Sequence, residues 1–162
     1  MVAFMSLAAG QPAPDFDVVA ADGRHLRLAD LRGQKNVVLY FYPADFTAVC
    51  TRETCGFRDA YAELAGQDTE VVGISVDDDG SHRKFADKYQ VTFPLVSDPD
   101  RTLARRYDAA GGLLHGLLGK TARVTYVIDK AGTIAAVFRG ELSASKHVDG
   151  ARAAITRLRA GS

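Results

Sequence analysis

The 162-residue chain has few of the features that mark nucleic-acid-binding or membrane proteins. Its 20 basic and 20 acidic residues cancel, so it lacks the broad positive charge on which nucleic-acid binding relies. The apolar stretch within residues 1–10 is far shorter than the roughly 20 residues of a membrane span, and it lacks the basic segment of a signal peptide. We therefore expect a cytoplasmic protein with no nucleic-acid or membrane partner.

Cysteine is also scarce, since the chain holds just Cys50 and Cys55. A domain of this length buries roughly 70% of its unfolded surface, so disulfides are not needed for its stability. The cytoplasm keeps thiols reduced, and a close cysteine pair there is more typical of catalysis than of structure. The histidines show no metal-ligand spacing, and we expect neither a metal nor an organic cofactor; they are His25, His82, His115 and His147.

The pattern of apolar residues predicts one domain over residues 1–162, with no linker or repeat. A hairpin is expected at 17–28 and strands at 37–42 and 71–76, with a helix between those strands that ends near Gly66. Further along we expect a helix at 81–89 capped by Ser81, an extended piece at 93–96, a short helix at 101–107, a loop at 111–119, a hairpin of 124–128 with 134–138, and a helix at 145–160. This order predicts an α/β fold, with a central mixed β-sheet flanked by helices.

Cys50 lies where a strand gives way to a helix. Thr47 is a favourable N-cap residue, which makes Cys50 the third helical position. Unpaired backbone N–H groups and the positive end of the helix dipole lie there, and both favour a thiolate. Cys50 also shares a helical face with Phe57 and Leu64, so we expect it to point toward the sheet.

Acidity alone does not make a fast thiol. Lowering a thiol pKa from about 8.5 to about 6 raises the thiolate fraction at pH 7 roughly thirtyfold. A thiolate of lower pKa is also a weaker nucleophile, which cancels roughly tenfold of that gain. Donors that stabilise the transition state must therefore supply the rest, and Thr47 together with an arginine from elsewhere are the natural candidates.

Cys55 lies about 140° around the helix axis from Cys50, and helix geometry separates their Cα atoms by roughly 8–9 Å. A disulfide tolerates no more than about 7 Å. A bond between the two cysteines would therefore require the helix to unwind, and the protein would alternate between two forms.

These residues carry a resemblance to the peroxiredoxins, specifically to the Q-type group, also called the bacterioferritin comigratory protein group. The family motif places a proline, then a threonine, then the peroxidatic cysteine three residues on, as in Pro43, Thr47 and Cys50. Cys55 matches the resolving cysteine of the Q-type group, and Arg123 falls where the family places its active-site arginine. The similarity extends over nearly the whole chain.

The resemblance implies a thioredoxin-like fold and a thiol-dependent peroxidase that acts on hydrogen peroxide and organic hydroperoxides. Cys50 would become a sulfenic acid and then form a disulfide with Cys55, which thioredoxin or a similar dithiol protein would reduce. Thr47 and Arg123 would hold the peroxide, while Pro43 would shield the sulfenic acid. We expect a monomer, as in many Q-type members, with a small dimer left open.

Some alternatives remain at the level of sequence. Each site residue also has a purely structural interpretation: a buried thiol, a helix cap, a surface charge, the end of a strand. A disulfide oxidoreductase would favour the spacing Cys-x-x-Cys, and here four residues intervene. A redox-sensing binding module would use the same cysteines as a switch. The chain also has Ala48-Val49 where many Q-type members have Pro-Gly, which could narrow the pocket entrance or stiffen the first turn.

Overall fold

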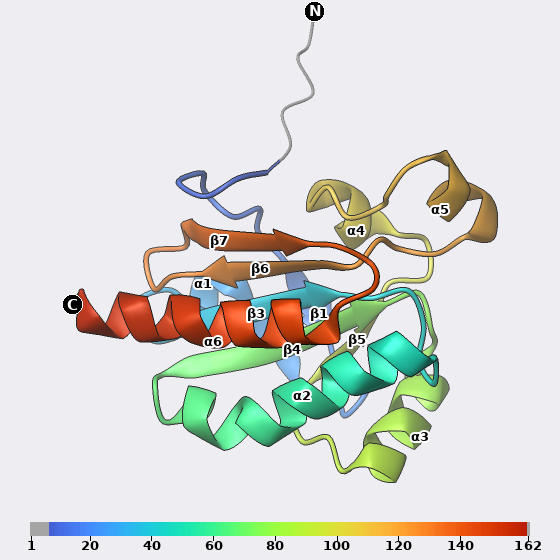
Figure 1. Cartoon of the computed structure of the whole chain (residues 1–162), viewed down its shortest axis with the longest axis horizontal. Helices are drawn as coiled ribbons and strands as arrows, with labels where there is room; N and C mark the ends of the chain where they lie inside the picture. The colour runs from blue at the N-terminus through green and yellow to red at the C-terminus, as the bar shows by residue number, and fades with distance from the viewer. Residues whose placement is uncertain (1–6, 162) are drawn as a thin grey trace, which may run out of the picture.

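The computed structural model describes residues 7–161, so most of the N-terminal stretch considered above lies outside the described residues. Its central sheet has the strand order β5-β4-β3-β6-β7, formed by Leu95–Ser97, Thr69–Ser75, Asn36–Phe41, Val124–Ile128 and Ile134–Arg139 (Figure 1). β3, β4 and β5 run parallel, whereas β6 and β7 are antiparallel to their neighbours. The expected mixed sheet is confirmed.

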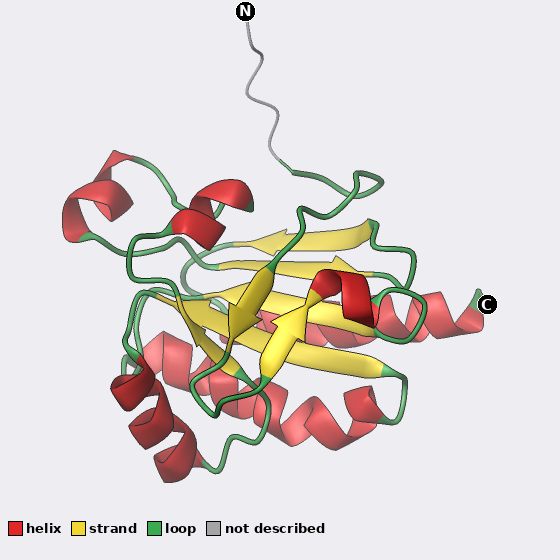
Figure 2. Cartoon of the chain, turned by 180° about the vertical axis from the view of Figure 1, so that it is seen from behind, coloured by secondary structure: helices red, strands yellow, loops and turns green. Residues whose placement is uncertain are grey.

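Two layers cover this sheet. Helices α2 (Ala48–Ala65), α3 (Asp79–Tyr89) and α6 (Ala144–Ala160) lie on one side, where Phe57, Leu64 and Phe85 are buried. The hairpin of β1 (Asp17–Val19) and β2 (His25–Arg27) crosses the other side together with the short helix α1 (Leu28–Leu31) (Figure 2). The strands β3 and β4 are fully buried and mostly apolar because each face of the sheet is covered.

Most elements fall within two residues of their predicted bounds, and two expectations were wrong. Helix α3 begins at Asp79 rather than Ser81, because the Asp78 carboxylate accepts a bond from the Ser81 N–H and serves as the cap. The glycine-rich segment expected as a loop contains a helix, α5 (Leu113–Leu118). The sequence pattern also did not predict α1. The remaining short helix, α4 (Thr102–Arg106), lies inside its expected range.

The register of the sheet brings three distant segments to one edge. Phe41 at the end of β3 pairs with Val124 at the start of β6, so Tyr42 and Arg123 leave the sheet side by side. Val124 also pairs with Arg139 at the end of β7, which places Gly140 and the following residue beside Arg123. The loop that leads into α2 starts from the same edge. This edge is therefore where the candidate residues meet.

Candidate active site

Cys50 lies in the first turn of α2, as the sequence predicts. The helix begins at Ala48 with Thr47 at its N-cap, which makes Cys50 the third helical residue. Its side chain is 1% exposed and packs with Tyr40 and Phe57, so it points inward toward the sheet. Both cysteines are free thiols in an unbroken helix.

Arg123 contacts the sulfur of Cys50 directly. Its Nη2 donates to the Cys50 Sγ at 3.1 Å, and its Nη1 donates to Glu53 Oε1 at 2.7 Å. Its Nε and backbone N–H are bonded to the carbonyl and carboxylate of Glu141, both at 3.0 Å. The guanidinium is thus held on three sides and is 3% exposed, so it is not the surface charge that the sequence left open.

The charges around Arg123 keep it a cation. Burial would lower the pKa of Arg123, but the neighbouring Glu53 and Cys50 outweigh burial and raise that pKa above its ordinary value. For Glu53 the balance is reversed. Burial raises the pKa of its carboxyl to about 7, although the nearby Arg123 opposes that rise. Cys50 and Glu53 therefore share one buried cation.

Thr47 and Pro43 lie on the segment that joins β3 to α2, on the approach to Cys50. The Thr47 hydroxyl does not cap the helix; it donates to the Ala44 carbonyl at 2.8 Å. With its hydrogen engaged, Thr47 Oγ1 can still accept a bond from a peroxide O–H. Its side chain is exposed and Pro43 is half-buried, so both are reachable from solvent.

Cys55 has different surroundings. It is half-buried and lines a hollow of about 530 Å³ between α2 and the start of α6. The two helices approach closely here, since a Cβ on Gly56 would lie 2.9 Å from Val148 Cγ2. Because α2 is continuous from Ala48 to Ala65, the separation argued from helix geometry applies, and a bond between the cysteines requires the helix to open.

A second buried group holds the loop ahead of α2, and we call it the Asp45 cluster (Tyr42, Asp45, Ser81 and His82). Asp45 Oδ1 accepts from the Tyr42 hydroxyl at 2.6 Å. Its Oδ2 lies 2.8 Å from both Ser81 Oγ and His82 Nδ1. The backbone N–H of Asp45 donates to Asp77 Oδ2 at 2.8 Å. Both carboxylate oxygens of Asp45 are thus satisfied, and the loop is tied to α3.

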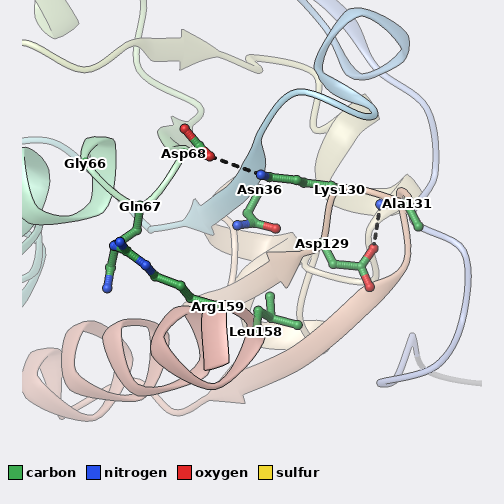
Figure 3. Close-up of a pocket in the computed structure, with 9 residues that line it drawn as sticks. All are labelled: Asn36, Gly66, Gln67, Asp68, Asp129, Lys130, Ala131, Leu158 and Arg159. Atoms are coloured by element: carbon green, nitrogen blue, oxygen red, sulfur yellow. Dashed lines mark hydrogen bonds and ion pairs between the residues drawn. The ribbon is translucent and has the colours of Figure 1, made fainter. Parts of the chain in front are cut away.

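Another hollow, of about 430 Å³, lies at the opposite end of the sheet (Figure 3). Asn36 at the start of β3 lines it, together with an ion pair between Lys130 and Asp68 of 3.1 Å. Its lining contains no cysteine, so it offers no thiol chemistry. The described residues contain no cluster of three or more His, Cys, Asp or Glu side chains fit for a metal ion. In residues 7–161, every helix is too short or too polar to cross a membrane.

Comparison with known proteins identifies the family of this fold and site. The model of the AhpC/TSA family matches residues 9–137. The chain belongs to this family. Chloroplastic peroxiredoxin Q of Populus jackii is 40% identical over 146 residues, which cover 90% of this chain and 67% of the relative. The peroxiredoxin Q of Gentiana triflora is 38% identical over the same length, and this chain spans 65% of it.

Solved structures of AhpC/TSA-type proteins share the fold. The peroxidoxin BcpB of Mycobacterium tuberculosis superposes with a TM-score of 0.84 at 35% identity, over 94% of this chain and 98% of that one. Peroxiredoxin Q of Xanthomonas campestris gives 0.81 at 28% identity, over 93% of this chain and 98% of that one. The resemblance to Q-type peroxiredoxins and the thioredoxin-like fold are thereby confirmed.

The sequence interpretation missed several residues of the site. Glu53 follows Cys50 by three positions and shares its helical face, and that spacing could have identified it. Glu141, Asp45 and His147 gave no such signal. Sheet register and helix packing bring Glu141 and His147 to the surroundings of Arg123 and Glu53. Asp45 lies in the loop itself, but its contacts with α3 depend on tertiary packing.

Proposed function

We propose that the protein is a thiol-dependent peroxidase that reduces hydrogen peroxide and organic hydroperoxides. The observation that carries this proposal is the 3.1 Å contact between Arg123 Nη2 and Cys50 Sγ inside a buried pocket. A fixed cation stabilises the thiolate and the negative charge that develops on the peroxide during attack. Membership of the AhpC/TSA family supports the same reaction class.

In the first step the Cys50 thiolate attacks one oxygen of the peroxide. The S–O bond forms as the O–O bond breaks, Cys50 becomes a sulfenic acid, and the other oxygen leaves as water or an alcohol after taking a proton. Arg123 polarises the peroxide, and Thr47 Oγ1 accepts a bond from its O–H. Pro43 limits the access of water to the sulfenic acid.

In the second step the Cys55 thiol attacks the sulfur of Cys50 and expels its oxygen as water, which gives the intramolecular disulfide. Because α2 is continuous, its first turns must open before the two sulfur atoms can meet. Thioredoxin or a similar dithiol protein then returns both cysteines to thiols, and its own cysteines become the disulfide.

Organic hydroperoxides are included because apolar side chains gather near this edge. Leu113, Leu117 and Leu142 are each at least 75% exposed. An ion pair of 3.4 Å between His115 and Glu141 holds α5 against the segment that contacts Arg123. The Xanthomonas bacterioferritin comigratory protein, 27% identical, was studied for alkyl peroxide reduction.

We further propose a cytoplasmic monomer, with a small dimer as the alternative that sedimentation would reveal.

Steady-state peroxide consumption with a thioredoxin system tests the proposal. We expect Cys50→Ser to abolish turnover, because the attacking sulfur is removed. Cys55→Ser should keep one rapid oxidation per site but lose recycling through the disulfide. Retained turnover in Cys50→Ser would overturn the proposal.

One further assay and the peroxide kinetics separate the two alternatives. Insulin reduction without peroxide would indicate a disulfide oxidoreductase instead. Oxidation that stops at one event per site in wild type, with the reductant present, would indicate a redox switch.

A further inference from the structure

His147 of α6 is fully buried beside Glu53, one of the charged groups around Cys50. Its Nε2 lies 2.9 Å from the Gly140 carbonyl oxygen, which can only accept, so Nε2 carries the hydrogen. Burial lowers the pKa of His147, which favours the neutral ring. In that neutral ring Nδ1 is an acceptor, and the Thr125 hydroxyl donates to it at 2.8 Å.

The second oxygen of Glu53 faces this same nitrogen. Glu53 Oε2 lies 3.6 Å from His147 Nδ1, too far for a hydrogen bond, and both side chains are 0% exposed. Among residues 7–161, Glu53 Oε2 has no hydrogen-bond partner. Nδ1 already accepts from the Thr125 hydroxyl, so it offers no hydrogen to Glu53. An ionised Oε2 without a hydrogen-bond donor is unfavourable in a buried space, and a proton on Oε2 removes that cost.

We propose that Glu53 holds a proton on Oε2, the oxygen that faces His147, and that this proton leaves the charge of Arg123 available to the Cys50 thiolate. We call Arg123, Glu53, His147 and Thr125 the Glu53 cluster. While the proton is held on Glu53 Oε2 and directed at Nδ1, the cluster carries one positive charge. When the proton leaves to solvent, the Glu53 carboxylate neutralises Arg123. His147 is then a positioning residue, since it acts on Cys50 through Glu53.

Other charged groups face the pair and are part of its balance. The groups facing Glu53 are Arg123 ahead of β6, Tyr40 of β3, Glu141 ahead of α6, His147 of α6, and Cys50 of its own helix; those facing His147 are Arg123, Glu141, Lys146 and Glu53. Burial raises the pKa of Glu53 to about 7, which agrees with a proton that is held on the acid side of neutral pH and lost as the pH rises through about 7.

This inference rests on the proposed peroxidase function, and the pH dependence of the Cys50 oxidation rate tests it. The rate at which Cys50 is oxidised by hydrogen peroxide is measured by stopped flow between about pH 6 and about pH 9. We expect the wild-type rate to fall about tenfold on the alkaline side, because an ionised Glu53 neutralises part of the charge of Arg123. This fall is smaller than the loss expected when a transition-state donor is removed completely. Glu53→Gln cannot lose this proton, so its rate should show no such alkaline fall.

Two neighbours should move the midpoint of the alkaline fall in opposite directions. His147→Leu removes the acceptor that favours the protonated acid, so the midpoint should move down by roughly half to one pH unit. Thr125→Val removes the hydroxyl that competes for Nδ1, so the midpoint should move up by a similar amount. Damage to packing alone would not give opposite signs. His25→Leu, at the exposed His25–Asp17 pair, is the matched control and should leave the midpoint in place.

The proton can also be observed without activity. In Cys50→Ser protein, the ¹³C carboxyl signal of Glu53 should titrate near neutral pH, and Thr125→Val should raise its midpoint. The inference is overturned if Glu53→Gln keeps the alkaline fall, or if His147→Leu and Thr125→Val shift its midpoint the same way or not at all. If His147→Leu does not fold, Thr125→Val and the carboxyl signal decide. A wild-type protein whose Cys50 does not react with peroxide would instead refute the proposed function.

Discussion

Two buried histidine–carboxylate pairs lie near Cys50, and their carboxylates flank it in the sequence: Asp45, paired with His82, precedes it, and Glu53, paired with His147, follows it. In the first pair, His82 Nδ1 lies 2.8 Å from Asp45 Oδ2, and each carboxylate oxygen of Asp45 has a partner. In the second pair the corresponding distance is 3.6 Å, and Glu53 Oε2 has no hydrogen-bond partner within residues 7–161. Both pairs have 0% side-chain exposure.

The difference shows how one kind of residue pair can serve two purposes. The Asp45 cluster has no unsatisfied carboxylate oxygen, so it fixes the loop that carries Pro43 and Thr47. The Glu53 cluster holds the cation Arg123 and leaves one oxygen unsatisfied, so its charge can change. Complete hydrogen bonding rigidifies a buried polar group, whereas incomplete bonding leaves a group whose protonation matters.

The largest effect on stability is expected from breaking the Asp45 cluster. Asp45→Ala removes the partner of two buried groups, the Tyr42 hydroxyl and His82 Nδ1, and of the half-buried Ser81 hydroxyl, so the free energy of unfolding should fall by about 3–5 kcal/mol. Urea denaturation measures it. Asp17→Ala removes the carboxylate of an exposed pair and is the control that should change stability little. Equal effects of the two substitutions would show that burial does not distinguish these pairs.

The Glu53 cluster contains a cation, Arg123, and the Asp45 cluster contains no arginine or lysine. Removing Arg123 should have a large effect on the rate of Cys50 oxidation. Arg123→Met takes away the donor to Cys50 Sγ, and the rate of Cys50 oxidation should drop about 10²–10³-fold. Stopped-flow oxidation by hydrogen peroxide measures this drop. Arg152→Met is the control, because Arg152 forms an exposed pair with Glu63. A loss below threefold in Arg123→Met would contradict the role given to the guanidinium.

Stability should depend on pH through Glu53. Burial raises the pKa of its carboxyl in the folded protein to about 7, above the ordinary value of 4.5. The folded state therefore binds more protons between these values, and the stability that Glu53 contributes is lost as pH rises through them. The loss should reach about 3 kcal/mol. Urea midpoints of wild type and Glu53→Gln should diverge in this window. Parallel curves for the two proteins would count against it.

The smallest effect is expected when each cluster loses one hydroxyl group, and the two clusters should respond differently. Ser81→Ala removes one donor to Asp45 Oδ2 and should lower stability by about 1 kcal/mol, with the alkaline fall in rate unchanged. Thr125→Val, the matched loss in the Glu53 cluster, should move that fall instead. An altered pH profile in Ser81→Ala would mean that both clusters tune Cys50.

Local patterns predicted the parts of this molecule that local forces set. The apolar runs of β3 and β4, the start of α2 at Thr47 and its end at Gly66 follow from the sequence alone. Cys50 and Thr47 were predictable because a strand, a cap and a helix lie within one short segment. Helix α5 was not, because the glycines at its ends are typical of a loop, and here they bound a short helix of six residues.

Residues that meet through tertiary structure could not be derived in the same way. Arg123 was placed by family resemblance alone, because its contact with Cys50 depends on the pairing of β3 with β6. His147 was considered only as one of four scattered histidines. Its contacts arise from the packing of α6 against the sheet, and no spacing within the sequence encodes them.

The oxidation of Cys50 and its link to Cys55 test the account most directly. Reduced Cys55→Ser protein is mixed with one equivalent of hydrogen peroxide, and mass spectrometry locates the added oxygen. The account predicts a sulfenic acid at Cys50, and in wild type a Cys50–Cys55 disulfide with loss of helical circular dichroism. An unmodified Cys50, or a linked form with α2 intact, would contradict it.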